Sequence, residues 1–337
     1  MNSTHLKILF ILLLIFCLSA CDSVDNQKKS AAKITDTTSS INVNSFLFLT
    51  EWFNKVGVYK YDLSTKKYSP VWWHPRENVI MLVYKPGNFP AYFFTAQRMG
   101  ERANFPLFSR LKLFIISADL SETKQIDRLG NGLQFTARWN SDNNLEVIYT
   151  SVDKSIASYI NQYTKVYDHY GKLIDSDLKT FDIEKSGFPQ LLPPQNKTLS
   201  PSGNFGVSFR EDSVYLKTAG SDSIRFIAVM GHNMNKISWS DDEKFLLIST
   251  LNLENQTTKT KKPETSELFI YSLSADSLVD VFGGAGLKNF FSTNDLLIFD
   301  DGFGKNSVIN IFNLNKQTIV DSIKTKEGCG LVVIPQL

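Results

Sequence analysis

Cysteine is scarce in this sequence. The 337 residues include three cysteines, and two of them, Cys17 and Cys21, lie in an apolar N-terminal segment, so that Cys329 is alone in the body of the chain. A single thiol cannot form an internal disulfide, and it cannot assemble a zinc site from cysteine ligands. The body of the chain must therefore fold without a disulfide and without a thiolate zinc cluster.

An excess of charge of one sign is lacking as well. The sequence has 36 basic and 34 acidic residues, which gives a formal net charge of +2. Proteins that bind nucleic acid through its phosphate backbone need a strong basic surplus on one face. The charge balance therefore gives no reason to expect a nucleic-acid partner.

Motifs of the common enzyme classes are missing too. The sequence contains no G-x-S-x-G, no H-E-x-x-H and no glycine-rich phosphate loop, because residues 283–286 (GGAG) are interpreted as a turn that no helix follows. Histidine in the body is limited to His74, His169 and His232. We expect no cofactor and no metal ion, and the pattern favours a non-enzymatic role while leaving an enzyme open.

The N-terminus carries a targeting segment. Lys7 precedes an apolar run over residues 8–18, which is too short to cross a bilayer core of about 30 Å as a helix. The run ends in the tetrapeptide L-S-A-C, whose cysteine is Cys21, and this tetrapeptide resembles the signal of bacterial lipoproteins. The resemblance implies cleavage before Cys21 and lipid on its sulfur, with more than one acyl chain for stable anchoring. An ordinary signal peptide with a chance cysteine is the alternative.

The residues after Cys21 bear on location. Asp22 follows the cysteine, and in enterobacterial lipoproteins an aspartate there favours the inner membrane, although the outer membrane stays open. The body is expected to face the periplasm or the cell exterior. Residues 22–40 have few apolar side chains and are interpreted as a flexible tether. The predicted plan is a signal peptide at residues 1–20, a lipidated cysteine with the tether at 21–40, and one folded body at 41–337.

The body repeats one unit. Residues 234–282 contain four short runs of apolar and β-branched residues, separated largely by turn-forming residues, which predict four antiparallel strands in sequence order. The same pattern predicts six groups, at residues 44–73, 79–129, 135–176, 197–229, 234–282 and 287–323, the first with three strands and the others with four. A single strand at residues 330–335 is left over.

Three turns in these groups share a pattern. They are WSDDEK at residues 239–244, LSPSGN at 199–204 and WNSDNN at 139–144, and each precedes a β-run. They resemble the W-S-P-D-G-K turn of TolB-type, WD40-like β-propeller repeats. The resemblance implies an all-β, six-bladed propeller, which the strand at 330–335 would close as the innermost strand of the first blade. Seven blades, through division of the third group, and unrelated hairpins are the alternatives.

The two faces of the predicted propeller differ in loop length. The longest connections, at residues 96–110, 152–162, 186–196 and 252–266, fall on one face, and long loops on a rigid scaffold are frequent contact sites. The loop at 96–110 combines arginine with aromatic residues, both common at interface hot spots. Candidate binding residues are therefore Arg98, Arg102, Phe105, Phe108 and Arg110 of this loop, together with His74 and His232, which are expected on the same face. The alternative is that the aromatic residues of this loop fold back onto the propeller.

Three functions stay open. The favoured one is a lipid-anchored propeller that binds a partner protein, or serves as a scaffold, through the long-loop face. The second is a lyase or hydrolase that uses His74 or His232 with carboxylates in the axial channel, and convergent histidine and aspartate would favour it. Two histidines of separate blades that met there could bind a metal ion with Asp300 or Asp301, but their spacing in the sequence gives no support for such a site. The third is a surface lipoprotein that captures a sugar or peptide, and an exposed strip of aromatic side chains would favour it.

Overall fold

The computed structural model describes residues 44–84, 88–102, 105–132, 134–152, 158–186, 198–210, 213–221, 224–229, 233–252, 265–285, 289–300, 307–325 and 331. All of these belong to one compact unit, Asn42–Leu337. The predicted signal peptide, Cys21 and the tether lie outside the described ranges. No helix within these ranges is long and apolar enough to cross a membrane.

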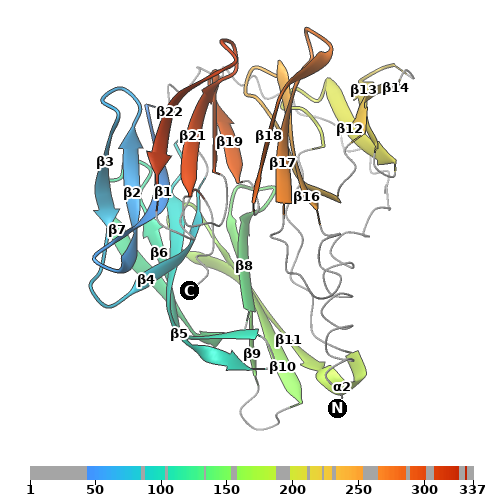
Figure 1. The fold of residues 1–337 in the computed structure, drawn as a ribbon. Coiled ribbons are helices and arrows are strands. Elements are labelled where there is room, and N and C mark those ends of the chain that lie inside the picture. The colour runs from blue at the N-terminus through green and yellow to red at the C-terminus, as the bar shows by residue number, and fades with distance from the viewer. Residues whose placement is uncertain are drawn as a thin grey trace, which may run out of the picture. The chain divides into compact units, whose positions relative to one another are not determined.

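The body is built from six antiparallel sheets of three or four strands, and neighbouring strands in each sheet are also neighbours in the sequence (Figure 1). Sheet 1 contains β1 (Ser45–Trp52), β2 (Lys55–Asp62) and β3 (Lys67–Trp72). Sheet 2 contains β4 (Asn78–Val83), β5 (Ala91–Arg102), β6 (Phe105–Ile116) and β7 (Thr123–Gly132). Sheet 3 contains β8 (Gln134–Trp139), β9 (Leu145–Val152), β10 (Tyr159–Tyr167) and β11 (Leu173–Asp182), after which comes the short helix α2 (Ile183–Ser186).

The second half of the body continues the pattern. Sheet 4 contains β12 (Phe205–Arg210), β13 (Ser213–Thr218) and β14 (Ile224–Val229). Sheet 5 contains β15 (Asn233–Trp239), β16 (Phe245–Asn252), β17 (Thr265–Ser272) and β18 (Ser277–Ala285). Sheet 6 contains β19 (Phe290–Thr293), β20 (Leu296–Asp300), β21 (Val308–Asn313) and β22 (Thr318–Lys324). The six predicted groups thus correspond to six sheets, and the first has the three strands that the sequence predicts.

The predicted turn chemistry is present between the first and second strands. In sheet 5 the Ser240 hydroxyl accepts a hydrogen bond from the Phe245 N–H at 3.0 Å and donates to the Asp242 carboxylate at 2.7 Å. In the corresponding turns Asn143 has φ 59° and Gly203 has φ 75°, the left-handed region that asparagine and glycine tolerate best. The side chains therefore satisfy the turn backbone and fix the register of each hairpin.

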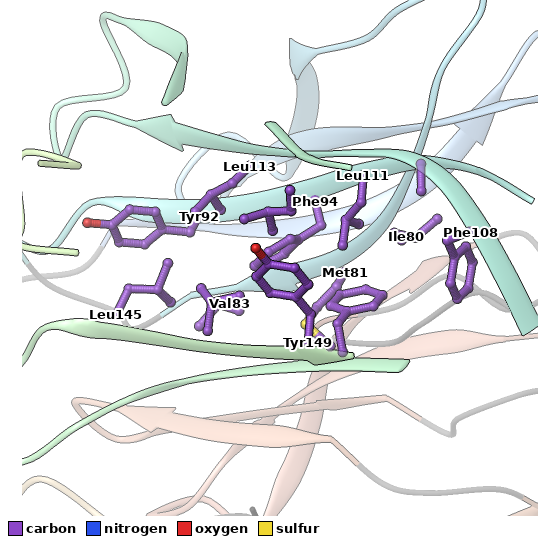
Figure 2. Close-up of a cluster of buried hydrophobic side chains, with 14 of the residues drawn as sticks. Ile80, Met81, Val83, Tyr92, Phe94, Phe108, Leu111, Leu113, Leu145 and Tyr149 are labelled. Carbon is purple, nitrogen blue, oxygen red and sulfur yellow. The ribbon is translucent and has the colours of Figure 1, made fainter. Parts of the chain in front are cut away.

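The sheets pack face to face through shared clusters of buried side chains. Alternate residues of a strand point to opposite faces of its sheet. Phe46 and Phe48 of β1 therefore pack against sheet 6, while Leu47 and Leu49 pack against sheet 2. Further clusters join sheets 2 and 3 (Figure 2), sheets 4 and 5, and sheets 5 and 6. The packing order is thus 4, 5, 6, 1, 2, 3, and within the described ranges no such cluster joins sheet 3 to sheet 4.

Three local predictions were wrong. Residues 96–110 were expected to form a loop, but β5 and β6 stay paired as far as Arg102 and Phe105. The polar residues are part of this ladder, and β-bulges at two register shifts accommodate the extra residues. Residues 283–285, expected in a turn, extend β18 and pair with β17. The first strand of the fourth group, expected at 197–200, is reduced to an isolated bridge between Leu199 and Gly206.

The predicted closing strand is described at one residue. Leu331 is 1% exposed and packs in the cluster that sheets 1 and 6 share. Its N–H donates to Asp300 Oδ2 at 2.9 Å. The rest of residues 330–335 lies outside the described ranges, so the pairing of this strand with β1 stays a prediction.

Candidate functional site

Three large aromatic side chains gather at one end of sheet 1. Trp52 ends β1, Phe53 is in the turn to β2, and Trp73 follows β3. Trp52 is 49% exposed and Phe53 is 74% exposed, whereas Trp73 is half-buried. We call Trp52, Phe53 and Trp73 the aromatic cluster.

The rings of the aromatic cluster contact one another. Ring centroids are 4.9 Å apart for Trp52 and Phe53, 5.6 Å for Trp52 and Trp73, and 6.4 Å for Phe53 and Trp73. Trp73 Nε1 also donates a hydrogen bond to the carbonyl oxygen of Trp52 at 3.0 Å. This bond satisfies the indole N–H and holds the Trp73 ring against the turn.

The backbone that carries Phe53 is unfavourable for this residue type. Trp52 pairs with Lys55, so Phe53 and Asn54 form a two-residue hairpin loop. Both have positive φ, 48° and 57°, as a type I′ turn requires. Asparagine, aspartate and glycine adopt this conformation readily, whereas a bulky phenylalanine there is an outlier that stores strain. The ring is also exposed, so burial does not offset the strain.

The segment after β3 connects the aromatic cluster to sheet 2. The Trp72 ring centroid lies 4.8 Å from that of Phe93 and 5.4 Å from that of Phe114, and the His74 ring stacks with Trp72 at 6.1 Å with an interplanar angle of 17°. His74 Nδ1 accepts a hydrogen bond from the Arg76 N–H at 3.2 Å. His74 is half-buried, and the stack on Trp72 and the bond from Arg76 fix the orientation of its ring close to the aromatic cluster in the chain.

A carboxylate follows three residues after His74. Glu77 accepts hydrogen bonds from Lys112 Nζ and, at 2.9 Å, from Thr95 Oγ1. Burial acts to raise the pKa of Glu77, but the bonds from Lys112 and Thr95 and the charge of Lys112 together hold it below its ordinary value. Glu77 therefore stays ionised and engaged with sheet 2 at neutral pH.

The site lies at the end of sheet 1 that is farther from the start of the body. The chain enters β1 at Ser45, and Trp52 is the last residue of this strand. Asn78 Oδ1, at the start of β4, accepts a hydrogen bond from the Val56 N–H at 3.0 Å and so ties the same ends of sheets 1 and 2 together. The turn at Phe53 and the segment 72–78 thus belong to one edge of the body.

The structure places the predicted binding residues in different environments. The backbones of Arg98, Arg102 and Phe105 lie in the β5–β6 hairpin. Phe108 is 8% exposed and packs 5.9 Å from Phe135, because β6 turns its ring into the core between sheets 2 and 3. It therefore belongs to the fold and is not exposed for contact. Arg110 is exposed, with φ 55°, and its N–H donates to Asn131 Oδ1 at 3.2 Å.

Two residues named for the enzyme alternative, His232 and Asp301, lie outside the described ranges, and His169 is exposed next to Tyr170. Asp300 is fully buried and accepts hydrogen bonds from the N–H groups of Asn289 and Leu331. Among the described residues, no group of three or more histidine, cysteine, aspartate and glutamate side chains is placed to hold a metal ion.

The aromatic cluster itself was not predicted. Its sequence signal is the dipeptide Phe53–Asn54 between two alternating β-runs, since a two-residue hairpin loop demands positive φ at its first position. A phenylalanine at that position does not favour the turn, so it indicates that the side chain has a role other than turn formation. The contribution of Trp73 depends on pairing between β2 and β3 and has no comparable local signal.

The sequence matches no protein-family model and no curated protein. Among solved structures it is similar to TolB from Acinetobacter baumannii, with 10% identity over 86% of this chain and a TM-score of 0.44, and it spans 65% of the TolB chain. It is also similar to the Pseudomonas aeruginosa periplasmic gluconolactonase PpgL, with 11% identity over 86% of this chain and 100% of the PpgL chain and a TM-score of 0.41. The chain is also similar to a structure from a nidogen/laminin complex, with 12% identity over 83% of this chain and 93% of that chain and a TM-score of 0.40. Likeness this distant assigns neither a family nor an activity.

Proposed function

We propose that this protein is a lipid-anchored β-propeller of the bacterial cell envelope that binds a ligand through the aromatic cluster. The observation that carries the binding role is Phe53, whose ring is 74% exposed although its backbone adopts φ 48°. Exposure and strain are both unfavourable for folding. Their combination supports a role for this ring in contact with another molecule.

The packing order of the sheets supports the propeller. Sheet 6 shares a core with sheet 1, so the first and last repeats are neighbours, as a ring requires. Contact between sheets 3 and 4 would complete six blades. The predicted strand at 330–335 would then supply the fourth strand of the first blade, next to β1.

The L-S-A-C motif supports lipid attachment at Cys21. In this proposal the tether connects the lipid to β1 and leaves the body in the periplasm or outside the cell. Asp22 favours the inner membrane by the enterobacterial rule. Membrane contact is made through the acyl chains, so the aromatic cluster stays available for a ligand.

A binding role explains the described carboxylates better than catalysis does. A general acid or base must reach a proton of the substrate. Glu77 is held by Lys112 and Thr95, and Asp300 is held by backbone N–H groups, so both serve the fold.

Detergent phase partitioning of the full-length protein tests the anchor. The wild-type protein is expected in the detergent phase with an acylated Cys21, and Cys21→Ser is expected in the aqueous phase without the added mass. Cys329→Ser is the matched control, because it removes the thiol of the body and leaves the motif intact. Detergent partitioning of Cys21→Ser that equals wild type would falsify the lipoprotein proposal.

Photo-crosslinking in intact cells tests the binding role. A photoreactive phenylalanine at position 53 is expected to form an adduct of lower mobility, whereas the same residue in place of Tyr170, which is 71% exposed in a turn of sheet 3, is expected to form none. A protein and a glycan both qualify as the adduct. If position 53 gives no adduct, or gives the same pattern as position 170, the aromatic cluster is not a ligand-binding surface.

A further inference from the structure

We infer that the aromatic cluster is a binding site for a neutral saccharide chain, whose sugar rings stack on Trp52, Phe53 and Trp73. This inference rests on the proposed binding role and names the chemical class of the ligand. A pyranose ring has C–H groups on its faces and hydroxyl groups around its edge. It therefore fits an aromatic surface that is bordered by polar groups.

The first argument is that folding alone does not explain Phe53. An asparagine or glycine at this position would adopt the positive φ readily and would remove an exposed ring from water. Within the part of the chain that the structure describes, the ring contacts of Phe53 are with Trp52 and Trp73, at centroid distances of 4.9 and 6.4 Å, and these two rings are themselves partly exposed. The ring is thus displayed at the tip of the turn.

The second argument is that the surface is preorganised. The hydrogen bond from Trp73 Nε1 to the Trp52 carbonyl fixes one indole, and the tilted ring contacts of Trp72 with Phe93 and Phe114 fix the segment that carries it. Rings that are ordered before binding lose little side-chain entropy when a ligand arrives. Such a surface suits a flexible saccharide, because the protein adds little to the conformational entropy that the saccharide itself loses on binding.

The third argument is size. An aromatic side chain presents about 150–250 Å² when fully exposed, so the exposed fractions of Trp52 and Phe53 correspond to roughly 200–300 Å² of aromatic surface. A stable interface between proteins takes about 800 Å² from each partner. The aromatic cluster is therefore too small to be a protein interface by itself, and it matches a small ligand or a short stretch of a polymer.

The fourth argument is charge. The charged residues within three positions of the cluster in the sequence are Glu51, Lys55 and Arg76, one acidic and two basic, and Glu51 and Lys55 are half-buried. Sites for anionic lipid surfaces gather about four to eight basic residues. The cluster also lies at the end of β1 away from Ser45, where the chain enters the body. These features favour a neutral ligand over a membrane surface.

Titration of the full-length protein in detergent micelles tests the inference. The probes are neutral hexasaccharides of α-1,4-linked glucose, β-1,4-linked glucose and β-1,4-linked N-acetylglucosamine, with tryptophan fluorescence and calorimetry as readouts. We expect at least one of them to bind and to change the tryptophan emission. Trp52→Ala and Phe53→Asn should each weaken this binding about tenfold or more, as expected for loss of one stacked ring. Tyr170→Ala, which removes an exposed ring from sheet 3, should leave binding unchanged.

The melting temperature of Phe53→Asn shows whether the Phe53 ring serves ligand binding or supports the fold. Phe53→Asn should not lower Tm, because asparagine suits the turn, even though binding is lost. A clear fall in Tm for Phe53→Asn would show that the ring supports the fold and would overturn the display argument. Unchanged saccharide affinity in both cluster variants would place the sugar site elsewhere.

The remaining outcomes also decide. If none of the three saccharides binds, the inference is wrong. A discrete protein adduct at position 53 without saccharide binding would keep the proposed binding role and replace the saccharide by a protein partner. Binding to vesicles of neutral or anionic phospholipid that Phe53→Asn abolishes would make the cluster a membrane contact. The anchor proposal is judged separately by the partitioning of Cys21→Ser.

Discussion

The phenolic hydroxyl of Tyr61 donates a hydrogen bond to the carboxylate of Asp321, which lies 260 positions later in the chain. Tyr61 belongs to β2 of sheet 1 and Asp321 to β22 of sheet 6. Lys66 Nζ lies 3.8 Å from the same carboxylate. A polar contact therefore accompanies the apolar core that the first and last sheets share, and it specifies how these sheets meet.

Tyr61→Phe is expected to destabilise the protein by about 1–2 kcal/mol at neutral pH, because the substitution keeps the ring and removes a hydrogen bond to a charged group. Chemical denaturation of both proteins measures the difference. Tyr170→Phe is the control, since Tyr170 is exposed, and it should leave the free energy of unfolding within about 0.5 kcal/mol of wild type.

The same pair predicts a pH dependence. Burial acts to raise the pKa of Asp321, but the Tyr61 hydrogen bond, the Ser322 N–H and the charge of Lys66 hold it below its ordinary value. A lowered pKa in the folded state stabilises the protein above the unfolded value of about 3.9, and this contribution is lost as the pH falls through the folded value. The difference between wild type and Tyr61→Phe should therefore shrink below about pH 4. A difference that stays constant to acid pH would show that the carboxylate is not the partner that matters.

A second polar contact joins sheets 2 and 3. The Asp127 carboxylate on β7 accepts hydrogen bonds from Lys165 Nζ at 2.7 Å and from the Tyr167 hydroxyl, both on β10. Although burial acts to raise it, these two partners hold the pKa of Asp127 below its ordinary value. Burial and the neighbouring Asp127 in turn raise the pKa of Tyr167, so its hydroxyl stays protonated and donates across the neutral range.

Lys165→Met is expected to lower the free energy of unfolding by about 1–3 kcal/mol, because it leaves a partly buried carboxylate with one donor fewer. Lys179→Met in the same sheet is the matched control: Lys179 is exposed and lies 3.6 Å from an exposed Asp177, an arrangement worth about 0–1 kcal/mol. Equal effects of the two substitutions in thermal and denaturant unfolding would contradict the importance of the contact between the sheets.

Much of the fold could be predicted because its signals are local. Alternating apolar runs gave the strands, and turn residues such as Ser240 and Asn143 gave their boundaries. The three-stranded first sheet followed from counting the runs. The β5–β6 hairpin was missed because polar residues form either a loop or a paired ribbon, and only the register of the two strands decides between them.

The functional surface was harder to predict for the same physical reason. Trp52 and Phe53 are adjacent in the sequence, but Trp73 reaches them through the pairing of β2 with β3. The Tyr61–Asp321 and Asp127–Lys165 contacts join residues of different sheets, and no periodicity in the sequence specifies such partners. Burial reversed one expectation, since the position of Phe108 in β6 points its ring into a core instead of toward a ligand.

Phe108→Ala is consequently expected to destabilise the protein by about 3–5 kcal/mol, the usual range for removal of a buried phenylalanine. Its ring packs near Phe135 in the core between sheets 2 and 3, as Figure 2 shows for the surrounding side chains. Gln97→Ala is the control, because Gln97 is an exposed residue of the same hairpin. A loss of ligand binding in Phe108→Ala would then report unfolding, whereas an unchanged Tm would show that this ring is not part of the core.

The buried side chain near the C-terminus provides the last prediction. Leu331 is 1% exposed in the core that sheets 1 and 6 share, and its N–H donates to the fully buried Asp300 at 2.9 Å. Leu331→Ala should cost about 2–5 kcal/mol, whereas Leu331→Met, which nearly conserves volume, should cost less than about 1.5 kcal/mol.

Truncation after Gly328 should cost more than Leu331→Ala, because it removes the side chain and also the N–H that Asp300 accepts. Denaturant unfolding of the three variants checks this order. None of the strands that the structure describes is removed in these variants, since β22 ends at Lys324, so the differences measure what the C-terminal segment adds where the first and last sheets meet. A truncated protein that unfolds at the wild-type denaturant concentration would show that this segment does not hold sheets 1 and 6 together.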